Sequence, residues 1–524
     1  MRELTGLNKK LNFLFSGFLR SFGALNEWLH HGHFLSNASA ARIYVGIQLN
    51  KIHIQALILY VSVLLLTGCE VGPDYKAPKL DLPPADAKSN TTAKEVQKFM
   101  SQKWWTVFHD ISLDKLETMA IERNASIKLA IESINEARAL AGVSRAELMP
   151  SVEMKGSADK TYASKNTTKP FGNSLDYLGR AGVSYEIDLF GKYRKANEAA
   201  RANLLSSRAA KEVVMLTVTA DVAKSYFNIR ALDAKLAIAR RTLQSREESY
   251  RVHKSRFRNG YCTELDCLRL EAEMASVKTT VLDLESSLEK AELALSILIG
   301  NSPREFMSKK ITRGSSLEKL RIPSDVPNGI PSDLIARRPD IVEVEGKLIA
   351  ANARIGEAKA AHFPSISLTS AFGFESKSLT NLFSSDSGML KFGGGLSLPI
   401  FSGGKLSALE EVAKIRYRKA LLDYTGAVKV AFREVLDSLV SRRQNREIVV
   451  SRTRQVNALK RSYSIALAQK ESGLIGMLDL LDVERNLLGA EMELVGALQN
   501  NLNAVVDLCK ALGGGWTKDA LKLN

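Results

Sequence analysis

The stretch LKFGGGLSLPIFSGGK, residues 390–405, alternates between apolar and small or polar side chains with a period of two. The apolar set is Leu390, Phe392, Leu396, Leu398 and Ile400, and the positions between them include Lys391, Gly393, Gly395 and Ser397. This pattern predicts a β-strand with one apolar and one wet face, of a length that crosses an outer membrane. The chain offers about four such stretches, whereas a membrane barrel needs about eight strands or more and no open edge.

The second half of the chain repeats the first. RAELMPSVEMKG (145–156) matches KAAHFPSISLTS (359–370) at an offset of 214 residues, around a proline that opens each alternating strand. NGYCTELDCLRLE (259–271) matches SGLIGMLDLLDVE (472–484) at an offset of 213 residues, and Gly300 and Gly513 keep that offset. One register held over so long a span indicates an internal duplication.

Each repeat is predicted to contain a helix, two strands and a long helical hairpin. Repeat 1 is assigned to residues 101–310, with strands near 151–162 and 180–190 and a hairpin near 195–300 whose tip lies near 260. Repeat 2 is assigned to residues 311–516, with strands near 365–376 and 390–401 and a hairpin near 405–512 whose tip lies near 473. Residues 517–524 form a tail.

Apolar residues recur every seven positions in the predicted hairpins. Examples are Leu236, Leu243, Tyr250 and Phe257 in repeat 1 and Val483, Ala490, Ala497, Ala504 and Ala511 in repeat 2. Sustained heptads predict coiled-coil packing. At 1.5 Å per residue, the segment 195–257 would form a helix on the order of 90 Å long, which is too long for a compact domain.

Four strands cannot close a barrel alone, so several chains must each donate four strands to a shared one. Three chains would give about twelve strands and a lumen. The predicted fold is therefore a mixed α/β membrane protein, in which long coiled-coil helices form an α-barrel and four amphipathic strands per chain contribute to a trimeric β-barrel.

The N-terminal region is typical of a secretory leader. IQALILYVSVLLLTGC (54–69) is an apolar run preceded by Lys51, and it is short for a membrane-spanning helix. Its end, Leu66-Thr67-Gly68-Cys69, resembles a bacterial lipobox, which implies cleavage between Gly68 and Cys69 and acylation of Cys69. Glu70 in the next position favours the outer membrane by the enteric sorting rule. The prefix 1–50 is unusually long for such a leader.

The proline-rich segment that follows, 69–100, is predicted to be an extended tether outside the core. The whole chain carries a formal charge of +16, which could suggest nucleic acid. No dense basic block, zinc-finger spacing or RNA-binding aromatic motif accompanies that charge, so positive residues spread over long solvated helices are the preferred interpretation.

Cysteine and histidine usage gives no metal or disulfide framework. Cys262 and Cys267 lie five residues apart, which on one helix would place them on different faces, and Cys509 stands alone. The sequence HHGH around His31 looks like a metal motif but falls within the leader. No metal site and no cofactor are predicted.

Five stretches together resemble one family: LTGCEVGPDYKAP (66–78), WWTVFHDISLDKL (104–116), GIPSDLIARRPDI (329–341), AANARIGEAKAAHFPSISL (350–368) and CKALGGGW (509–516). The chain is similar to the TolC-like outer-membrane efflux channels, in the OprM/NodT-type lipoprotein branch, over about residues 66–516. The resemblance implies a homotrimer with a twelve-stranded barrel in the outer membrane of a Gram-negative bacterium and a helical tunnel in the periplasm. It also implies a periplasmic adaptor protein and an inner-membrane pump, often of the resistance-nodulation-division type, and hence a part in efflux and multidrug resistance.

The resemblance assigns the hairpin tips to the periplasmic mouth. Gly260 and Gly473 would turn the chain there, with Leu265, Asp266, Leu478 and Asp479 close to the gate. Relatives of the OprM type carry a carboxylate two residues after the second tip glycine, whereas this chain has Ile475. We therefore expect an apolar ring that closes by dewetting.

No enzyme is predicted, because the sequence has no phosphate-binding glycine loop, no nucleophile elbow and no catalytic His/Asp/Ser set. Within the channel class, a type I secretion duct and a metal-ion efflux duct stay open as alternatives, since the pump selects the cargo. A lipid-anchored coiled-coil protein without a pore is the alternative of another class, and the amphipathic strands argue against it.

Overall fold

The computed structural model describes residues 70–78, 103–162, 174–308, 311–320, 338–514 and 516. All of them belong to one compact unit, Cys69–Asn524. The leader 1–68, the predicted acylation site Cys69 and the tail 517–524 lie outside the described residues. None of the described helices is long and apolar enough to cross a bilayer.

The duplication is visible in the element lengths. Repeat 1 contains η1 (Trp104–Phe108), α4 (Ile111–Arg123), α5 (Ala125–Ala146), α6 (Lys192–Arg258), α7 (Glu264–Leu298) and α8 (Pro303–Ser308). Repeat 2 contains η2 (Leu317–Lys319), α10 (Pro339–Ala360), α11 (Lys405–Glu471) and α12 (Met477–Ala511). Helices α6 and α11 each have 67 residues, α7 and α12 each have 35, and α5 and α10 each have 22.

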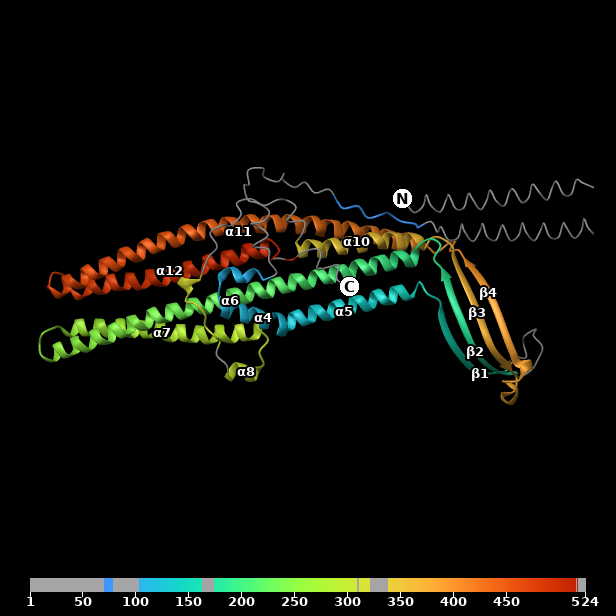
Figure 1. Ribbon diagram of the computed structural model, residues 1–524, viewed down its shortest axis with the longest axis horizontal. Helices are drawn as coiled ribbons and strands as arrows, with labels where there is room; N and C mark the ends of the chain where they lie inside the picture. Colours follow the sequence, from blue (N-terminus) through green and yellow to red (C-terminus); the bar gives the residue numbers. More distant parts are fainter. Residues whose placement is uncertain are drawn as a thin grey trace, which may run out of the picture. The chain divides into compact units, whose positions relative to one another are not determined.

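Each repeat contributes two strands to a single antiparallel sheet with the order β1-β2-β3-β4. The strands are β1 (Ser151–Thr161), β2 (Ser174–Ile187), β3 (Ser365–Ser376) and β4 (Gly388–Ser397), and they lie side by side in Figure 1. The β2–β3 ladder, with pairs such as Val183 with Ser370, joins the two repeats. The outer edges of β1 and β4 have no strand partner among the described residues.

Two strand boundaries differ from the predicted ones. β2 was expected at 180–190 but runs from Ser174 to Ile187, because its ladder with β1 continues to the pair Thr161–Ser174. β4 was expected at 390–401 but runs from Gly388 to Ser397. It ends just before Pro399, which has no N–H to donate to a ladder.

The long helices form two hairpins, α6 with α7 and α11 with α12 (Figure 1). Several heptad positions of the hairpins are buried within the chain, as shown by Leu236 of α6 and by Ala497 and Ala504 of α12. Nearer the first tip, Phe257 is 41% exposed. The main hydrophobic cluster lies where η1 and α4 pack against α6 and includes Trp104 and Phe227.

Arg338 fixes the start of α10 against α11 and α12, the hairpin of the same repeat. It is buried, donates hydrogen bonds to the carbonyls of Ala431 (3.3 Å) and Ala511 (3.0 Å), and forms ion pairs with Asp340 (2.8 Å) and Glu434 (2.6 Å). Arg338, which lies in the family-resembling stretch GIPSDLIARRPDI (329–341), therefore joins the start of α10 to α11 and α12.

Candidate functional site

The segment 70–78 docks along α10 and the start of α6. The Val71 N–H donates to the Phe190 carbonyl at 3.2 Å, and the Asn352 side chain donates to the Pro73 carbonyl at 2.9 Å. Tyr75 packs against the Ile341–Leu348 cluster and donates a hydrogen bond to Glu345 at 3.2 Å. The interpretation of this segment as lying outside the core is therefore wrong for Tyr75.

A buried cation holds the first described residue of the chain. Lys195 Nζ lies 3.2 Å from a carboxylate oxygen of Glu70 and 2.8 Å from one of Glu198. Gly356 of α10 allows this docking, since a Cβ there would lie 2.9 Å from the Val71 carbonyl oxygen. No sequence pattern pointed to Lys195, and Asn352 and Gly356 stood out only as part of the stretch AANARIGEAKAAHFPSISL (350–368).

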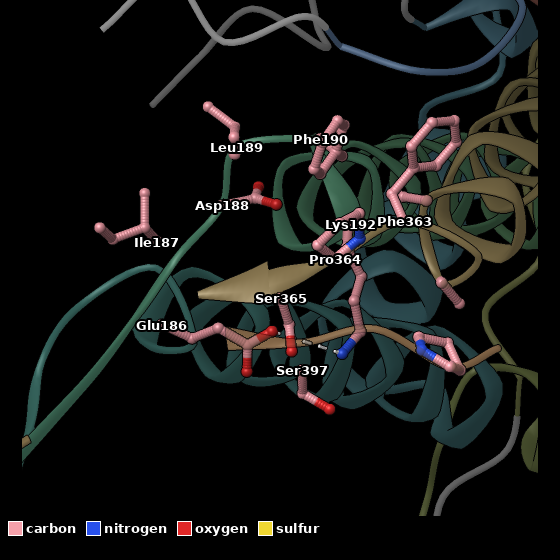
Figure 2. Close-up of a pocket in the computed structure, with 13 residues that line it drawn as sticks. Glu186, Ile187, Asp188, Leu189, Phe190, Lys192, Phe363, Pro364, Ser365 and Ser397 are labelled. Carbon is pink, nitrogen blue, oxygen red and sulfur yellow. Dashed lines mark ion pairs between the residues drawn. The ribbon is translucent and has the colours of Figure 1, made fainter. Parts of the chain in front are cut away.

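A pocket of about 290 Å³ lies at the junction of strands and helices (Figure 2). It is lined by the last residues of β2 and β4, the first residue of β3, and the segments that follow β2 and precede β3. Phe190 and Phe363 stack beside it with ring centroids 4.7 Å apart. Its acids have structural partners: Glu186 accepts from Tyr193 at 2.9 Å, and Asp188 accepts from the Arg194 N–H at 2.8 Å. This arrangement braces the junction and assembles no catalytic set.

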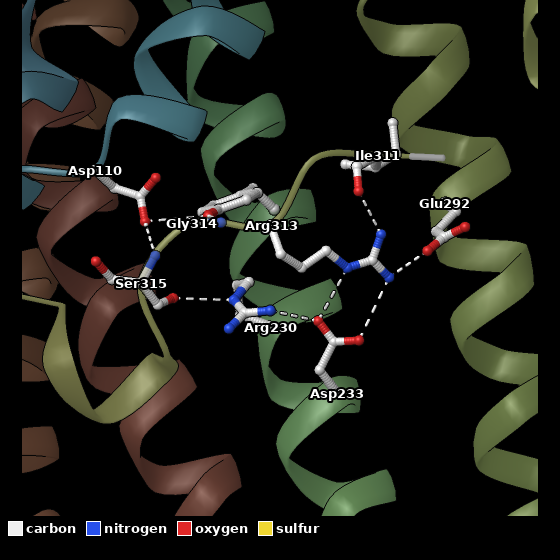
Figure 3. A network of polar contacts seen from close by, with 9 residues as sticks. Asp110, Arg230, Asp233, Glu292, Ile311, Arg313, Gly314 and Ser315 are labelled. Carbon is white, nitrogen blue, oxygen red and sulfur yellow. Dashed lines mark hydrogen bonds and ion pairs between the residues drawn. The ribbon is translucent and has the colours of Figure 1, made fainter. Parts of the chain in front are cut away.

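The linker between the repeats is tied to repeat 1 by the polar network in Figure 3. Arg313 forms ion pairs with Asp233, at 3.2 Å, and with Glu292. Asp110, the N-cap of α4, also accepts from the Ser315 N–H at 2.9 Å and from the Tyr226 hydroxyl at 3.1 Å. Burial raises the pKa of Tyr226 to about 12, so the hydroxyl stays protonated and able to donate.

The two hairpin tips share one backbone turn. Gly260 and Gly473 both have φ of 76°, the left-handed region that favours glycine. At tip 1 the Gly260 N–H donates to Phe257 (2.9 Å) and the Tyr261 N–H to Arg256 (2.9 Å). At tip 2 the corresponding bonds run from Gly473 to Lys470 (3.2 Å) and from Leu474 to Gln469 (2.8 Å). Both are Schellman turns, in which glycine is the usual C′ residue.

Asp266 and Asp479 cap the helices that leave the tips. Asp266 accepts from the Thr263 hydroxyl at 2.7 Å, while its N–H donates back to Thr263 at 3.2 Å. Asp479 accepts from the Gly476 N–H at 3.0 Å. Both carboxylates thus lie in the first turn of a helix, where negative charge is favourable. Their contacts within one chain are structural.

Leucines at equivalent positions of the tips are exposed. Leu265 is 54% exposed and Leu478 is 53% exposed. Tyr261 and Leu474, one residue after each tip glycine, are 81% and 75% exposed. Large exposed apolar patches are common at protein–protein contact sites, so these side chains are candidates for such a contact.

Ile475 is half-buried, one residue before the N-cap of α12. The equivalent residue of repeat 1 is Cys262. The prediction that Cys262 and Cys267 face different sides of a helix is wrong, because Cys262 precedes α7 and lies in the turn. Both thiols donate to the carbonyl of His253, at 3.3 Å and 3.5 Å.

A charged group joins the two hairpins below the tips. Arg246 of α6 is buried and lies 3.3 Å from Glu484 of α12 and 3.9 Å from Glu273 of α7. Arg485 pairs with Glu273 at 3.2 Å. Burial raises the pKa of Glu484, and the Arg246 charge opposes that rise. The described residues include no cluster of three or more His, Cys, Asp or Glu suited to a metal ion.

Two long helical hairpins joined to a four-stranded sheet with open edges are the architecture of an outer-membrane channel protomer, not of an enzyme. The chain belongs to the outer membrane efflux protein family, whose sequence model matches residues 116–301 and 330–514. Each match covers most of one repeat.

Similar proteins cover nearly the whole chain. The antibiotic efflux pump outer membrane protein ArpC of Pseudomonas putida is 32% identical over 475 residues, 89% of this chain and 97% of that protein. The cation efflux system protein CusC of Escherichia coli K12 is 30% identical over 463 residues, 88% of this chain and 99% of that protein. Among solved structures, the Campylobacter jejuni CmeC outer membrane channel has a TM-score of 0.80 at 26% identity, over 86% of this chain and 96% of that one. The Neisseria gonorrhoeae MtrE outer membrane channel, in its open state, has a TM-score of 0.76 at 31% identity, over 86% of this chain and all of that one.

Proposed function

We propose that this chain is the exit duct of a tripartite efflux system and assembles as a trimer that conducts substrates passively across the periplasm and the outer membrane. A periplasmic adaptor and an inner-membrane pump of the resistance-nodulation-division type would deliver the cargo. The observation that carries this proposal is a pair of open faces, one on each repeat, which are the two halves of one interface.

The first open face is on α11. Within the chain, α10 of repeat 2 covers α6 of repeat 1 at Ala199, Ala202 and Ala209, which are buried. The residues of α11 at the corresponding positions, 213 further along the chain, are Val412, Ile415 and Leu422, and they are 40%, 39% and 71% exposed. Apolar groups at these positions indicate a helix that is covered by another copy.

The second open face is on α5. Helix α10 lies between α6 and α11, whereas α5 packs along α6 and makes only minor contact with α4 among the described elements. Leu129, Leu140 and Val143 of α5 are 69%, 58% and 60% exposed. If α5 of one copy covers α11 of the next, the contact is heterologous and generates a ring.

The sheet supports the same arrangement. The free edge of β4 in one copy and the free edge of β1 in the next would pair, which removes both open edges. Three copies would then form a barrel of about twelve strands, wide enough for a lumen.

Planar-bilayer recording, combined with native mass measurement of the detergent-extracted protein, tests the duct. We expect three chains per particle and a conducting pore. A monomer that conducts, or a trimer with no conductance at any voltage, would contradict the proposal. Deletion of the gene should raise sensitivity to the cargo of the pump encoded beside it. That measurement would also identify the cargo, which relatives named for antibiotics and for cations leave open.

We also propose that Cys69 is the acylated mature N-terminus. Support comes from the docking of Glu70 and Val71 at the junction between strands and helices, which is where the periplasmic face of the bilayer would meet the barrel. Acyl chains on the preceding residue would then reach the lipid without unfolding the segment 70–78. Palmitate should label the protein, and Cys69→Ala should lose the label. A label kept by the variant would contradict acylation at this position.

The tips are proposed as the gate, with Gly260 and Gly473 turning the chain, Asp266 and Asp479 capping the helices, and Leu265, Leu478 and Ile475 supplying apolar contact between hairpins. Ile475→Asp should hydrate an apolar constriction and raise resting conductance. If Ile475 serves only to pack within its own hairpin, the same variant loses trimer yield without a change in single-channel conductance. Recording from the folded variant separates these outcomes.

A further inference from the structure

We propose that Cys262 and Cys267 are a disulfide-forming pair that can fix the tip of the first hairpin covalently. The two thiols belong to different local structures: Cys262 lies in the turn after Gly260, and Cys267 lies in the first turns of α7. Nothing in the gate as described above requires a sulfur atom at either position.

The geometry brings the two sulfurs together. Cys262 Sγ and Cys267 Sγ lie 3.3 Å and 3.5 Å from the same carbonyl oxygen, that of His253 on α6. The motif explains the approach. Thr263 is the N-cap of α7, so Cys262 occupies N′ and Cys267 occupies N4, the two positions that meet in a hydrophobic staple.

Repeat 2 shows the same motif without sulfur. With Gly476 as the N-cap of α12, Ile475 occupies N′ and Leu480 occupies N4. Leu480 is 7% exposed and Cys267 is 8% exposed, so the burial of the N4 side chain is matched. An aliphatic pair therefore suffices for packing at this place, and the first tip has a dithiol in its stead.

The reaction is a thiol–disulfide exchange with a protein or small-molecule disulfide as oxidant. Cys262 is half-buried and is the more accessible thiol; burial raises the pKa of the Cys267 thiol, so Cys267 reacts second. The Cys262 thiolate attacks one sulfur of the oxidant, and the other oxidant sulfur leaves as a thiolate. Cys267, once deprotonated, attacks Cys262 Sγ and displaces the second oxidant sulfur. The two cysteines lose two protons and two electrons, and the two sulfurs of the oxidant gain them and become two thiol groups.

The consequence is a difference between the tips. A closed disulfide ties the turn to α7, whereas tip 2 depends on Schellman bonds, one cap and aliphatic packing. The inference rests on the proposed function in one respect, since tips in the periplasm would meet an oxidising compartment. Chemical oxidation of the purified protein tests the pair whether or not that placement holds.

Peptide mapping of the full-length purified trimer decides the question. Trypsin should release Asn259–Arg269, which contains both cysteines, and Asn486–Lys510, which contains Cys509 alone. The folded protein is treated with oxidised glutathione, denatured with chelator and iodoacetamide, and mapped with and without prior reduction. We expect the first peptide to carry no alkyl group before reduction and two after it, and the second peptide to carry one in both samples. Two alkyl groups before reduction would overturn the proposal. Blocked thiols that chelator alone releases would also overturn it, in favour of a bound metal.

A second measurement tests the stiffening of the tip. Native trypsin cleavage after Arg258 should become several-fold faster when reductant is added, while cleavage after Lys470 at tip 2 should not change. The double variant Cys262→Ile/Cys267→Leu copies the pair of repeat 2, so it should fold and show no response to reductant. A response kept by this variant would assign the effect to another site.

Discussion

Helices α6 and α11 are two copies of one helix in different surroundings. Both have 67 residues and begin after a glycine of left-handed φ, Gly191 and Gly404. Within the chain α6 is covered by α5, α7, α10 and α12, whereas α11 is covered by α10 and α12. This difference supports the proposal that the exposed apolar residues of α11 contact another copy, because the equivalent residues of α6 are covered by a helix within the chain.

Substitutions in the proposed interface on α11 should have the strongest consequence. Ile415→Asp combined with Leu422→Asp should abolish the trimer, because burying two unpaired carboxylates costs several kcal/mol per site. Native mass measurement should show monomers. Arg433→Asp, at a residue 70% exposed on the same helix, is the matched control and should assemble normally. Trimers from the double variant would mean that α11 faces solvent.

A smaller change in stability is expected from glycine substitutions at equivalent positions of α10 and α5. Gly356 of α10 has no room for a Cβ, whereas the equivalent Gly142 of α5 has no atom within 4 Å of that position. Gly356→Ala should lower the free energy of unfolding by about 1–3 kcal/mol through overpacking against segment 70–78. Gly142→Ala should raise it by about 1 kcal/mol through helix propensity. Equal losses in thermal unfolding would show that α5 is covered as tightly as α10 in the assembly.

Helix α4 has no counterpart in the described part of repeat 2. Its Glu117 is fully buried with neither carboxylate oxygen hydrogen-bonded among the described residues, and burial raises its pKa well above the ordinary value. The protonated form is therefore favoured by folding. This contribution to stability is complete below the unfolded pKa and is lost as pH rises through the folded one.

Glu117→Gln should remove that loss. Thermal unfolding from pH 4.5 to pH 8 should show wild-type stability falling relative to the variant, by about 1–3 kcal/mol at the alkaline end. Parallel curves for the two proteins would mean that Glu117 has a partner at neutral pH.

The smallest effects concern the helix caps after the tips. Thr263→Ala should destabilise α7 by about 1 kcal/mol, because the hydroxyl caps the helix. Gly476 has an extended backbone and no side chain to cap α12. A threonine hydroxyl at this position should cap the helix, so Gly476→Thr should stabilise α12 by about a few tenths of a kcal/mol. Hydrogen exchange at residues 264–268 and 477–481 measures both. The reverse order of effects would show that the caps are not equivalent.

Much of this fold could be predicted from the sequence because its signals are local or repeated. The alternation in 365–376 and 390–401 indicated strands, the heptads indicated hairpins, and Gly260 and Gly473 indicated the turns. The prediction failed where a residue's role depends on helix start positions or on distant partners. Cys262 and Cys267 meet because α7 begins at Glu264, and Lys195 becomes important only when Glu70 docks beside it.

The entropy cost of covering a helix differs between α6, whose face is alanine, and α11, whose face is valine, isoleucine and leucine. α6 and α10 belong to one chain, so their effective concentration is set by the connecting segments and close packing of small residues is enough to join them. Separate copies must first lose translational and rotational freedom, which costs about 4–15 kcal/mol. Larger apolar side chains at the same positions offset that cost, because each Å² of apolar surface that they bury contributes about 25 cal/mol. If another copy covers α11 as we propose, duplication within one gene allowed the two versions of the helix to diverge, with the more apolar face where the chain itself supplies no link.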